Sequence, residues 1–120
     1  MEAINHEDNY RNTKGKFFGL YFTDGIIEIK VLSSVADFVK EGTVLKHCVY
    51  TNDYYKRSGS LILSARLRTD PDIPVETIEI SLNTFEIIQS RGYKNSPSPY
   101  HESIMSLMKS SIPKIRILAA

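Results

Sequence analysis

Residues 45–57, with the sequence LKHCVYTNDYYKR, form the densest group of side chains in the chain that could carry chemistry. The only cysteine, Cys48, directly follows one of the three histidines, His47. An imidazole can take or give a proton near neutral pH, and a thiolate is a nucleophile. The segment is therefore either part of a binding or catalytic site, or a core helix that happens to carry a histidine and a cysteine.

The two reactive side chains are not expected to act on each other. Neighbouring residues on a helix point about 100° apart, so His47 cannot readily serve Cys48 as a base, and a partner such as His101 would have to come from elsewhere. The alternative is that Cys48 is a small core residue, because free cysteines are often buried. His47 is either a proton donor or acceptor for a ligand, or a half-buried histidine bonded to a backbone carbonyl.

A second set of polar side chains belongs to strands. Glu79 lies in the middle of an apolar strand pattern, where glutamate is unfavourable unless its face is solvated or it has a partner. Together with Gln89 and Arg66 it could form the floor of a pocket. The alternative is a solvent-facing strand surface with cross-strand ion pairs.

The register of the hairpin that contains Glu79 separates these alternatives. A two-residue turn at positions 83–84 pairs Ile80 with Ile87 and points Glu79 away from the apolar face. A three-residue loop instead pairs Glu79 with Gln89 and gathers polar residues on one face. Burial of the apolar side chains favours the first register.

The remaining elements follow from hydrophobic periodicity and turn residues. We expect a first hairpin over residues 17–31 with its turn at Asp24 and Gly25, and a helix that Ser34 caps, that Gly42 ends, and that buries Val35, Phe38 and Val39. We further expect a helix over 43–55 with a break near residues 51–53, a strand over 59–68 and a loop over 69–74. After the second hairpin we expect a loop at 91–99 with a left-handed Gly92 and a helix from Pro99 with Ile104, Leu107, Met108 and Ser111 on one face. The apolar tail is expected to be a last strand or a cut inside a larger protein. These elements predict an α+β fold, in which an antiparallel sheet made of an N-terminal β-hairpin and a three-stranded meander carries helices on one face.

Composition limits the classes of function. The chain has 120 residues, 42% of them hydrophobic, and a net charge of +1. One domain is expected, and binding to nucleic acid would have to rest on local clusters of charge. The polar segment 1–15 lacks the apolar core of a signal peptide, no run is long enough to cross a membrane, and a single cysteine suits a reducing compartment. We therefore expect a cytoplasmic protein without membrane contact. No CxxC or HxxxH occurs, so neither a metal site nor a cofactor is expected.

Five segments taken in order, LKHCVYTNDYY, LILSARLR, ETIEI, IIQSRGYKN and YHESIMSLM, resemble the PcfJ-like family of conjugative plasmids and related mobile elements. The resemblance runs from about residue 42 to 108 and leaves out the first hairpin. It implies a context of DNA transfer rather than a reaction, and longer proteins of which residues 1–120 would be one domain. It strengthens the positions that match its pattern, which are His47, Cys48, Tyr54, Glu79, Gln89, Arg91, Gly92 and Asn95.

The leading hypothesis is a domain with a polar pocket that binds a nucleotide or nucleic acid. His47 would exchange protons, Glu79 would accept a hydrogen bond or act as a base, Arg91 would contact phosphate, and residues 92–95 would form a cradle of backbone amides. The expected ligand-binding residues are Cys48, Tyr54, Arg66, Gln89, Arg91, Gly92 and Asn95. One alternative is a hydrolase or transferase in which His47 and Glu79 lie within hydrogen-bond reach, and another is a non-catalytic module that docks proteins of a DNA-transfer apparatus.

Overall fold

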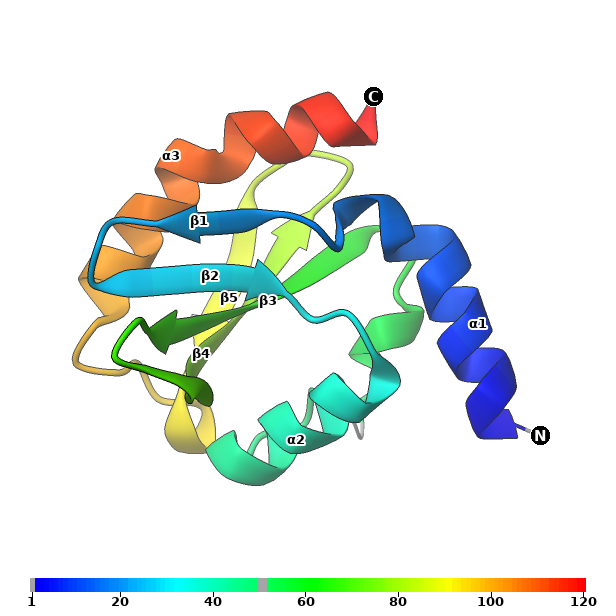
Figure 1. Ribbon diagram of the computed structural model, residues 1–120, viewed down its shortest axis with the longest axis horizontal. Coiled ribbons are helices and arrows are strands. Elements are labelled where there is room, and N and C mark those ends of the chain that lie inside the picture. The colour runs from blue at the N-terminus through cyan, green and yellow to red at the C-terminus, as the bar shows by residue number, and fades with distance from the viewer. Residues whose placement is uncertain (1, 50–51) are drawn as a thin grey trace.

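A computed structural model describes residues 2–49 and 52–120 and shows one five-stranded antiparallel sheet with the strand order β1-β2-β3-β4-β5 (Figure 1). The strands are β1 (Tyr21–Thr23), β2 (Ile27–Val31), β3 (Ser60–Leu67), β4 (Asp70–Ser81) and β5 (Ile87–Arg91). The helices are α1 (Glu2–Lys14), α2 (Val35–Leu45) and α3 (His101–Ala119), with the short 3-10 helices η1 (Gly15–Phe17), η2 (Tyr54–Lys56) and η3 (Tyr93–Asn95). The predicted α+β class is confirmed, and so is the hairpin followed by a meander.

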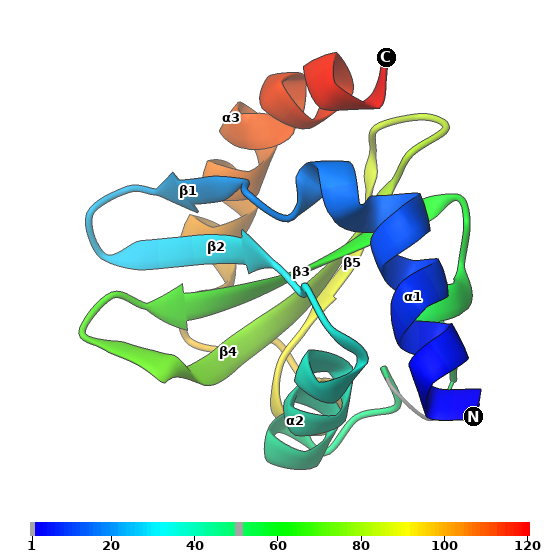
Figure 2. The same cartoon turned by 45° about the vertical axis from the view of Figure 1, so that its right-hand side comes forward.

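The sheet is covered on both of its faces, because β3 is buried on both. Leu61 and Leu63 join the core beneath α3, whereas Ile62 packs with Tyr10 of α1 and Phe38 of α2 on the opposite side. Both views show the sheet passing between α3 and α2 (Figures 1 and 2). The helices do pack on the sheet, but they lie on both faces and not on one as expected: α3 covers one face, and α1 and α2 cover the other, where Ile62 of β3 is buried.

The C-terminal segment is helical to Ala119, so the expected last strand does not form. The predicted apolar face of this helix is confirmed, because Ile104, Met108 and Ser111 are buried, and the face continues to Ile115. In the part of the chain that the structure describes, no helix has both the length and the apolar character that crossing a bilayer requires.

The first hairpin turns one residue later than expected. Phe22 lies opposite Ile29 rather than Ile27, and the backbone N–H of Asp24 donates to the carbonyl of Ile27 at 3.3 Å. The turn is therefore centred on Gly25, which has a φ of +98°, and on the residue after it. The carboxylate of Asp24 accepts the N–H of Ile27 at 2.8 Å, which favours this turn. Pairing that shifts by two residues keeps Phe22 on the buried face.

Helix α2 begins as predicted and ends later. The hydroxyl of Ser34 accepts the N–H of the third helical residue at 3.1 Å. The helix passes through Gly42 and ends where Lys46 adopts a left-handed conformation with φ of 54°. The helix expected over residues 43–55 is therefore wrong, because turns and η2 follow Lys46. Two residues of that expected helix, 50–51, lie outside the described part of the chain.

The buried face of α2 differs from the expected stripe. Val39 is 42% exposed, whereas Phe38 and Glu41 are both 0% exposed. A carboxylate that the predicted stripe did not include thus occupies a core position of α2. Its hydrogen-bond partners decide what it can do there.

Strand β4 begins inside the segment expected to be a loop, residues 69–74. Asp70 pairs with Leu67, and Pro74 lies opposite Arg66. The register between β3 and β4 shifts twice in this stretch. Proline is tolerated there because the ladder is irregular at this end of the strand, where residues 70–73 are exposed and Pro74 is buried.

Strands β4 and β5 combine both predicted registers. Ile80 lies opposite Ile87, as in the favoured register. A register shift follows, and beyond it Glu79 lies opposite Gln89, as in the alternative register. The extra residue is Ile88, whose side chain is 54% exposed. This bulge keeps the apolar pairs near the turn and still gathers the polar cluster farther along the strands.

Candidate functional site

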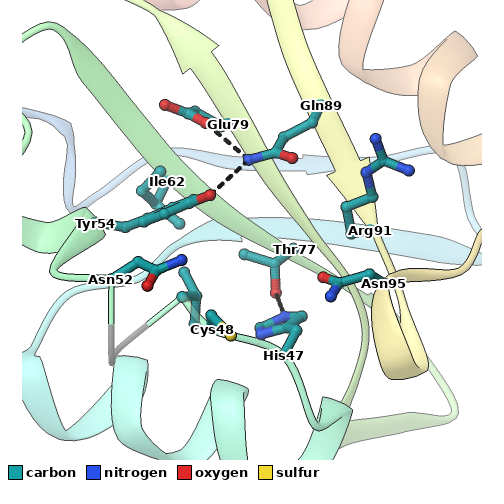
Figure 3. A pocket seen from close by; sticks show the side chains of 11 residues that line it. His47, Cys48, Asn52, Tyr54, Ile62, Thr77, Glu79, Gln89, Arg91 and Asn95 are labelled. Carbon is teal, nitrogen blue, oxygen red and sulfur yellow. Dashed lines mark hydrogen bonds between the residues drawn. The ribbon is translucent and has the colours of Figure 1, made fainter.

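A cavity of about 420 Å³ lies between the segment that follows α2, the helix η2 and strands β4 and β5 (Figure 3). Its lining residues are His47, Cys48, Val49, Asn52, Tyr54, Ile62, Thr77, Glu79, Gln89, Arg91 and Asn95. Apart from Arg66 and Gly92, this set contains every residue that the sequence predicted for a site. Asn52 was not expected in the site, and Thr77 was expected only in the polar cluster of the alternative register, opposite Arg91, where the structure places it.

Local structure explains why these residues converge. Alternation along β4 directs Ile78 and Ile80 into the core beneath α3, so Thr77 and Glu79 face the cavity. The bulge in β5 places Gln89 opposite Glu79. The left-handed stop of α2 turns the chain so that the next residues lie over the same face.

Gln89 joins two sides of the cavity. Its Nε2 donates to the Tyr54 hydroxyl and to Oε1 of Glu79, both at 3.0 Å (Figure 3). Because a carboxylate only accepts hydrogen bonds, the amide nitrogen of Gln89 has to face Glu79. The amide oxygen is left without a hydrogen bond from any described residue. The orientation of Gln89 is therefore fixed, with an acceptor available to a ligand.

Glu79 is a buried carboxylate, not a solvent-facing one. It is 4% exposed, and its Oε2 accepts from Ser60 at 2.6 Å and from Arg57 at 3.1 Å. The Arg57 guanidinium also lies 3.7 Å from the centre of the Tyr54 ring. The negative charge of Glu79 is thus compensated from outside the cavity, and an anionic ligand would not meet an uncompensated carboxylate.

His47 is bonded to a strand side chain. Its Nε2 lies 2.8 Å from the Thr77 hydroxyl, and the same hydroxyl donates to Oε2 of Glu41 at 2.6 Å. Nδ1 of His47 is sheltered and has no hydrogen-bond partner among the described residues. Burial lowers the pKa of His47, which keeps the imidazole neutral near pH 7.

The expected pair of His47 with Glu79 is not formed. The hydrogen bonds of Glu79 go to Ser60, Arg57 and Gln89, and that of His47 goes to Thr77. His47 and Glu79 line the same cavity, but each forms its hydrogen bonds with other residues. The carboxylate that reaches His47, through Thr77, is Glu41 of α2.

Glu41 lies at the centre of this second network. Its Oε1 accepts from Ser64 at 3.0 Å and lies 3.5 Å from Nη2 of Arg66. Burial raises the pKa of Glu41 to about 7, although the hydrogen bonds from Thr77 and Ser64 and the charge of Arg66 act in the opposite direction. Arg66 therefore serves Glu41, and its expected place in the pocket is wrong.

The sequence contained a signal for Glu41. It lies three residues after Phe38 and four before Leu45, which places it on the buried side of α2. A glutamate inside an apolar stripe indicates a buried carboxylate with partners elsewhere in the fold. Nothing local in the sequence names those partners, because Thr77 and Ser64 are brought in by the sheet.

The rim of the cavity carries polar groups without partners. No described residue forms a hydrogen bond or ion pair with the side chains of Arg91, Asn52 or Asn95. Asn52 lies beside Tyr54 on one side, and Arg91 and Asn95 lie on the other (Figure 3). The polar floor is thus bonded internally, whereas the rim offers one cation and two side-chain amides.

Gly92 has a structural role outside the cavity. Its φ is −97°, so the expected left-handed conformation is wrong, and Lys94 and Asn95 adopt it instead. A Cβ at position 92 would lie 2.9 Å from the carbonyl oxygen of Ser96 and 3.0 Å from that of Val75. Glycine is required here by this close approach of backbone.

The expected cradle of backbone amides is only partly available. The N–H of Gly92 donates to Ser96 at 2.8 Å, and the N–H of Asn95 donates to Gly92 at 3.0 Å. These two donors hold η3 in shape and are not free for a phosphate. A ligand on this side would meet the side chains of Arg91 and Asn95.

Cys48 is exposed, so the expectation that it is a core residue is wrong. It lines the mouth of the cavity next to His47. His101, considered as a partner for the thiol, instead contacts Glu76 at 2.9 Å on the α3 side of the sheet. His101 therefore does not act as a base for Cys48. Cys48 is nevertheless an accessible thiol at the site.

Comparison with known proteins places this chain in a family. A family model described as PcfJ-like protein matches residues 1–105, and the chain therefore belongs to the PcfJ-like family. The match includes α1 and the first hairpin, which the sequence resemblance had left out. No curated protein and no solved structure matches the chain.

Proposed function

We propose that the cavity of this PcfJ-like protein binds one nucleotide unit, either free or at an end of a nucleic-acid strand. The observation that carries the proposal is the contrast between a floor of satisfied polar groups and a rim of unsatisfied ones. The rim groups are exposed to water, so a ligand that pairs with them exchanges hydrogen bonds with water and breaks none within the protein. The volume of about 420 Å³ lies within the range of small-molecule sites, roughly 300–1,000 Å³.

Arg91 would contact the phosphate. Its guanidinium is exposed at the rim and has no carboxylate partner among the residues described. A guanidinium binds phosphate oxygens through paired N–H donors, and the amide of Asn95 can add a further donor. Arg57 compensates Glu79, so the charge of Arg91 is left for the ligand.

Gln89 and Tyr54 would contact the base. The Tyr54 hydroxyl accepts a hydrogen bond from Gln89, so its own hydrogen can be donated to a ligand. The free oxygen of Gln89 beside it is an acceptor. This donor and acceptor pair complements a base edge that presents an acceptor beside an N–H, and Asn52 supplies further hydrogen bonds.

Membership of the PcfJ-like family is consistent with this function. The resemblance of the chain to proteins of conjugative plasmids and mobile elements fits a domain that binds nucleotides or strand ends during DNA transfer. Binding of a nucleotide unit is the common chemistry, and either a free nucleotide or a strand end could supply it.

Fluorescence anisotropy with labelled single-stranded and duplex DNA, and competition by mononucleotides, tests the proposal. The matched pair of variants is Arg91→Gln and Arg68→Gln, because Arg68 is also exposed but bonds Gly25 at the far hairpin turn. Loss of one charged phosphate contact is expected to weaken binding by Arg91→Gln about tenfold or more. Arg68→Gln should bind like the wild type.

Alkylation of Cys48 gives an independent readout on the unlabelled protein. A bound nucleotide should slow the reaction of this single thiol with iodoacetamide, and Arg91→Gln should remove the protection. Competition by mononucleotides would identify a free-nucleotide site, whereas binding confined to DNA would identify a strand end. Absence of binding at low salt, or equal loss of binding in both arginine variants, would overturn the proposal.

A further inference from the structure

A second hollow lies beside the cavity. It is a groove of about 550 Å³ between the end of α2, strand β4 and the segment that begins with η3. Its lining is mostly apolar, and Ile73 and Tyr93 contribute large side chains that are 48% and 52% exposed. The nucleotide site proposed for the cavity leaves this groove unused.

The groove and the cavity share three of their walls. Each wall is a segment that contributes one residue to the groove and the residue two positions later to the cavity, in the pairs Leu45 and His47, Val75 and Thr77, and Tyr93 and Asn95. Along a strand such as β4, side chains two positions apart point to the same face and are about 7 Å apart. The two hollows are therefore neighbouring compartments of one surface.

Cations without carboxylate partners border both compartments. Lys46 and Lys94 are exposed and lie in two of the shared walls, and Arg91 lies at the cavity beside η3 (Figure 3). None of the three forms an ion pair with any residue that the structure describes. Asp70 and Asp72, which are exposed at the start of β4, limit this positive surface beyond the groove. Such a row of cations complements a ligand with several phosphates.

Tyr93 gives the groove a surface on which a base can stack. Its ring is half-exposed, and Nζ of Lys94 lies 5.5 Å from the ring centre. The Tyr93 hydroxyl forms no hydrogen bond with the described residues, so the ring is not held by another part of the fold. Any base can stack on such a ring, because every base has a π-face.

We propose that the ligand is a single-stranded nucleic acid and not a free nucleotide, with one base in the cavity and the neighbouring base in the groove against Tyr93. The phosphate between the two bases lies at Arg91, and the next phosphate lies at Lys46 and Lys94. Neighbouring bases of a single strand can be unstacked and held in separate pockets. The inference deepens the proposed function and rests on it, because it selects the strand from the two sources named there.

The charges favour a nucleic acid over an apolar peptide as the occupant of the groove. An apolar peptide would cover Ile73 and the ring of Tyr93 but would leave the three cations without a partner. A strand that enters the cavity covers the same ring and also brings a phosphate to each end of η3. Continuity with the cavity thus points to one ligand that spans both compartments.

Nitrogen-15 NMR titrations with oligonucleotides of increasing length test the proposal. The probes are adenylate and thymidylate series of one, two and three nucleotides, each with a terminal phosphate. Stacking of the second base should make the dinucleotide bind about tenfold or more tightly than the mononucleotide. The groove residues Val44, Ile73 and Val75 should shift with the dinucleotide and not with the mononucleotide. Equal affinities for the two lengths in both series would overturn the proposal.

Substitutions of Tyr93 give a matched comparison at one position. Tyr93→Leu should remove the gain from the second nucleotide, whereas Tyr93→Phe should keep it, because the ring stacks without the hydroxyl. Both variants should bind the mononucleotide like the wild type, since the second base is absent. A dinucleotide affinity that is unchanged in Tyr93→Leu would overturn the proposal.

The salt dependence of trinucleotide binding tests the second phosphate contact. Each phosphate that is neutralised adds about 0.7 to the slope of log K against log salt for single strands. The double variant Lys46→Gln, Lys94→Gln should therefore lose about 0.7 or more of this slope. The control is Lys109→Gln, because Lys109 is exposed on α3 and forms no ion pair with the described residues. An unchanged slope in the double variant would overturn the proposed path of the strand.

The two proposals fail separately. Mononucleotide binding that depends on Arg91, without any gain from a second nucleotide, would keep the proposed function and overturn the strand site. Binding of neither mononucleotides nor trinucleotides would overturn both. A gain that depends on the ring of Tyr93 and on the lysine pair would support the strand site.

Discussion

Glu41, Glu76 and Glu79 are each less than 5% exposed. Each of these three carboxylates has a different set of hydrogen-bond and charge partners. Glu79 has an arginine and two neutral donors, Glu76 has a histidine and serine donors, and Glu41 has two hydroxyls with an arginine at longer range. Because a buried charge is costly unless paired, the weakest compensation is at Glu41. This is the residue whose ionisation should be most visible in stability.

Glu41→Gln is expected to change how stability depends on pH. The pKa of Glu41 is raised from 4.5 to about 7, so the folded state binds its proton more tightly than the unfolded state does. Its contribution to stability is therefore complete below pH 4.5 and is lost as pH rises through about 7. Relative to wild type, Glu41→Gln should gain on the order of 3 kcal/mol in unfolding free energy between these limits.

Urea unfolding at a series of pH values measures this difference. Glu102→Gln is the control, because this substitution removes the same charge from an exposed residue of α3. A constant offset between wild type and Glu41→Gln would be the cost of altered hydrogen bonds, which is independent of pH. A difference that is flat from pH 5 to pH 8 would contradict the raised pKa.

At the scale of elements, Glu76 attaches the start of α3 to the sheet. Its oxygens accept from Ser90 at 2.6 Å, from the hydroxyl and the N–H of Ser98 at 2.6 and 2.8 Å, and contact His101 at 2.9 Å. Burial alone would raise the pKa of Glu76, but these hydrogen bonds outweigh it and lower the pKa below 4.5. The loop that carries η3 is thus held at both of its ends.

Glu76→Gln should destabilise the fold by about 3 kcal/mol, because the amide turns a donor toward groups that need an acceptor. The sign of the pH effect is opposite to that of Glu41. The stability that Glu76 contributes is present above pH 4.5 and is lost as pH falls through its lowered pKa. Thermal unfolding should therefore show the gap between wild type and Glu76→Gln closing in acid, and a gap that widens in acid would be inconsistent with this account.

The elements also show what sequence patterns can and cannot predict. Alternation identified β3, and the Ser34 cap identified the start of α2, because both signals are local. The bulge at Ile88 was not predictable, since each register satisfies a different part of the hairpin and only the folded sheet combines them. The end of α2 was misplaced because glycine suggested a stop, whereas Lys46 takes the left-handed position.

The candidate site was predictable in its residue types but not in its pairing. Polar residues at unfavourable strand positions, such as Glu79, indicated a cluster, and the structure brings it together with Gln89. The partner of His47 was assigned to the wrong glutamate because contacts between α2 and β4 connect residues that are 36 positions apart, Glu41 and Thr77. No periodicity within either element contains that information.

At the scale of the whole molecule, α1 packs against the segments that support the site. Tyr10 is 3% exposed, its hydroxyl donates to the Leu32 carbonyl, and its ring lies 5.3 Å from those of Phe18 and Phe38. Lys14 at the end of α1 donates to the carbonyl of Arg57 at 2.7 Å. The N-terminal helix thus supports the segment from which Arg57 reaches Glu79.

Tyr10→Ala should destabilise the entire domain by about 3–5 kcal/mol, as expected when a buried aromatic ring is removed. Asn9→Ala is the control at the exposed neighbouring position. Urea unfolding followed by circular dichroism and by the backbone NMR resonances of β3 and β4 should give coincident transitions for both variants. Loss of helix signal before the loss of these strand resonances would show that α1 unfolds separately from the site.

The most direct test of the central claim is an NMR titration of the nitrogen-15-labelled domain with nucleoside monophosphates and with a short single-stranded oligonucleotide. Binding in the cavity should shift backbone resonances of residues 47–49, 52–54, 77–79 and 89–95, and the side-chain amides of Asn52, Gln89 and Asn95. Resonances of α3 away from the cavity should not move. Absence of shifts at millimolar ligand, or shifts confined to α3 and the first hairpin, would contradict a nucleotide site in this cavity.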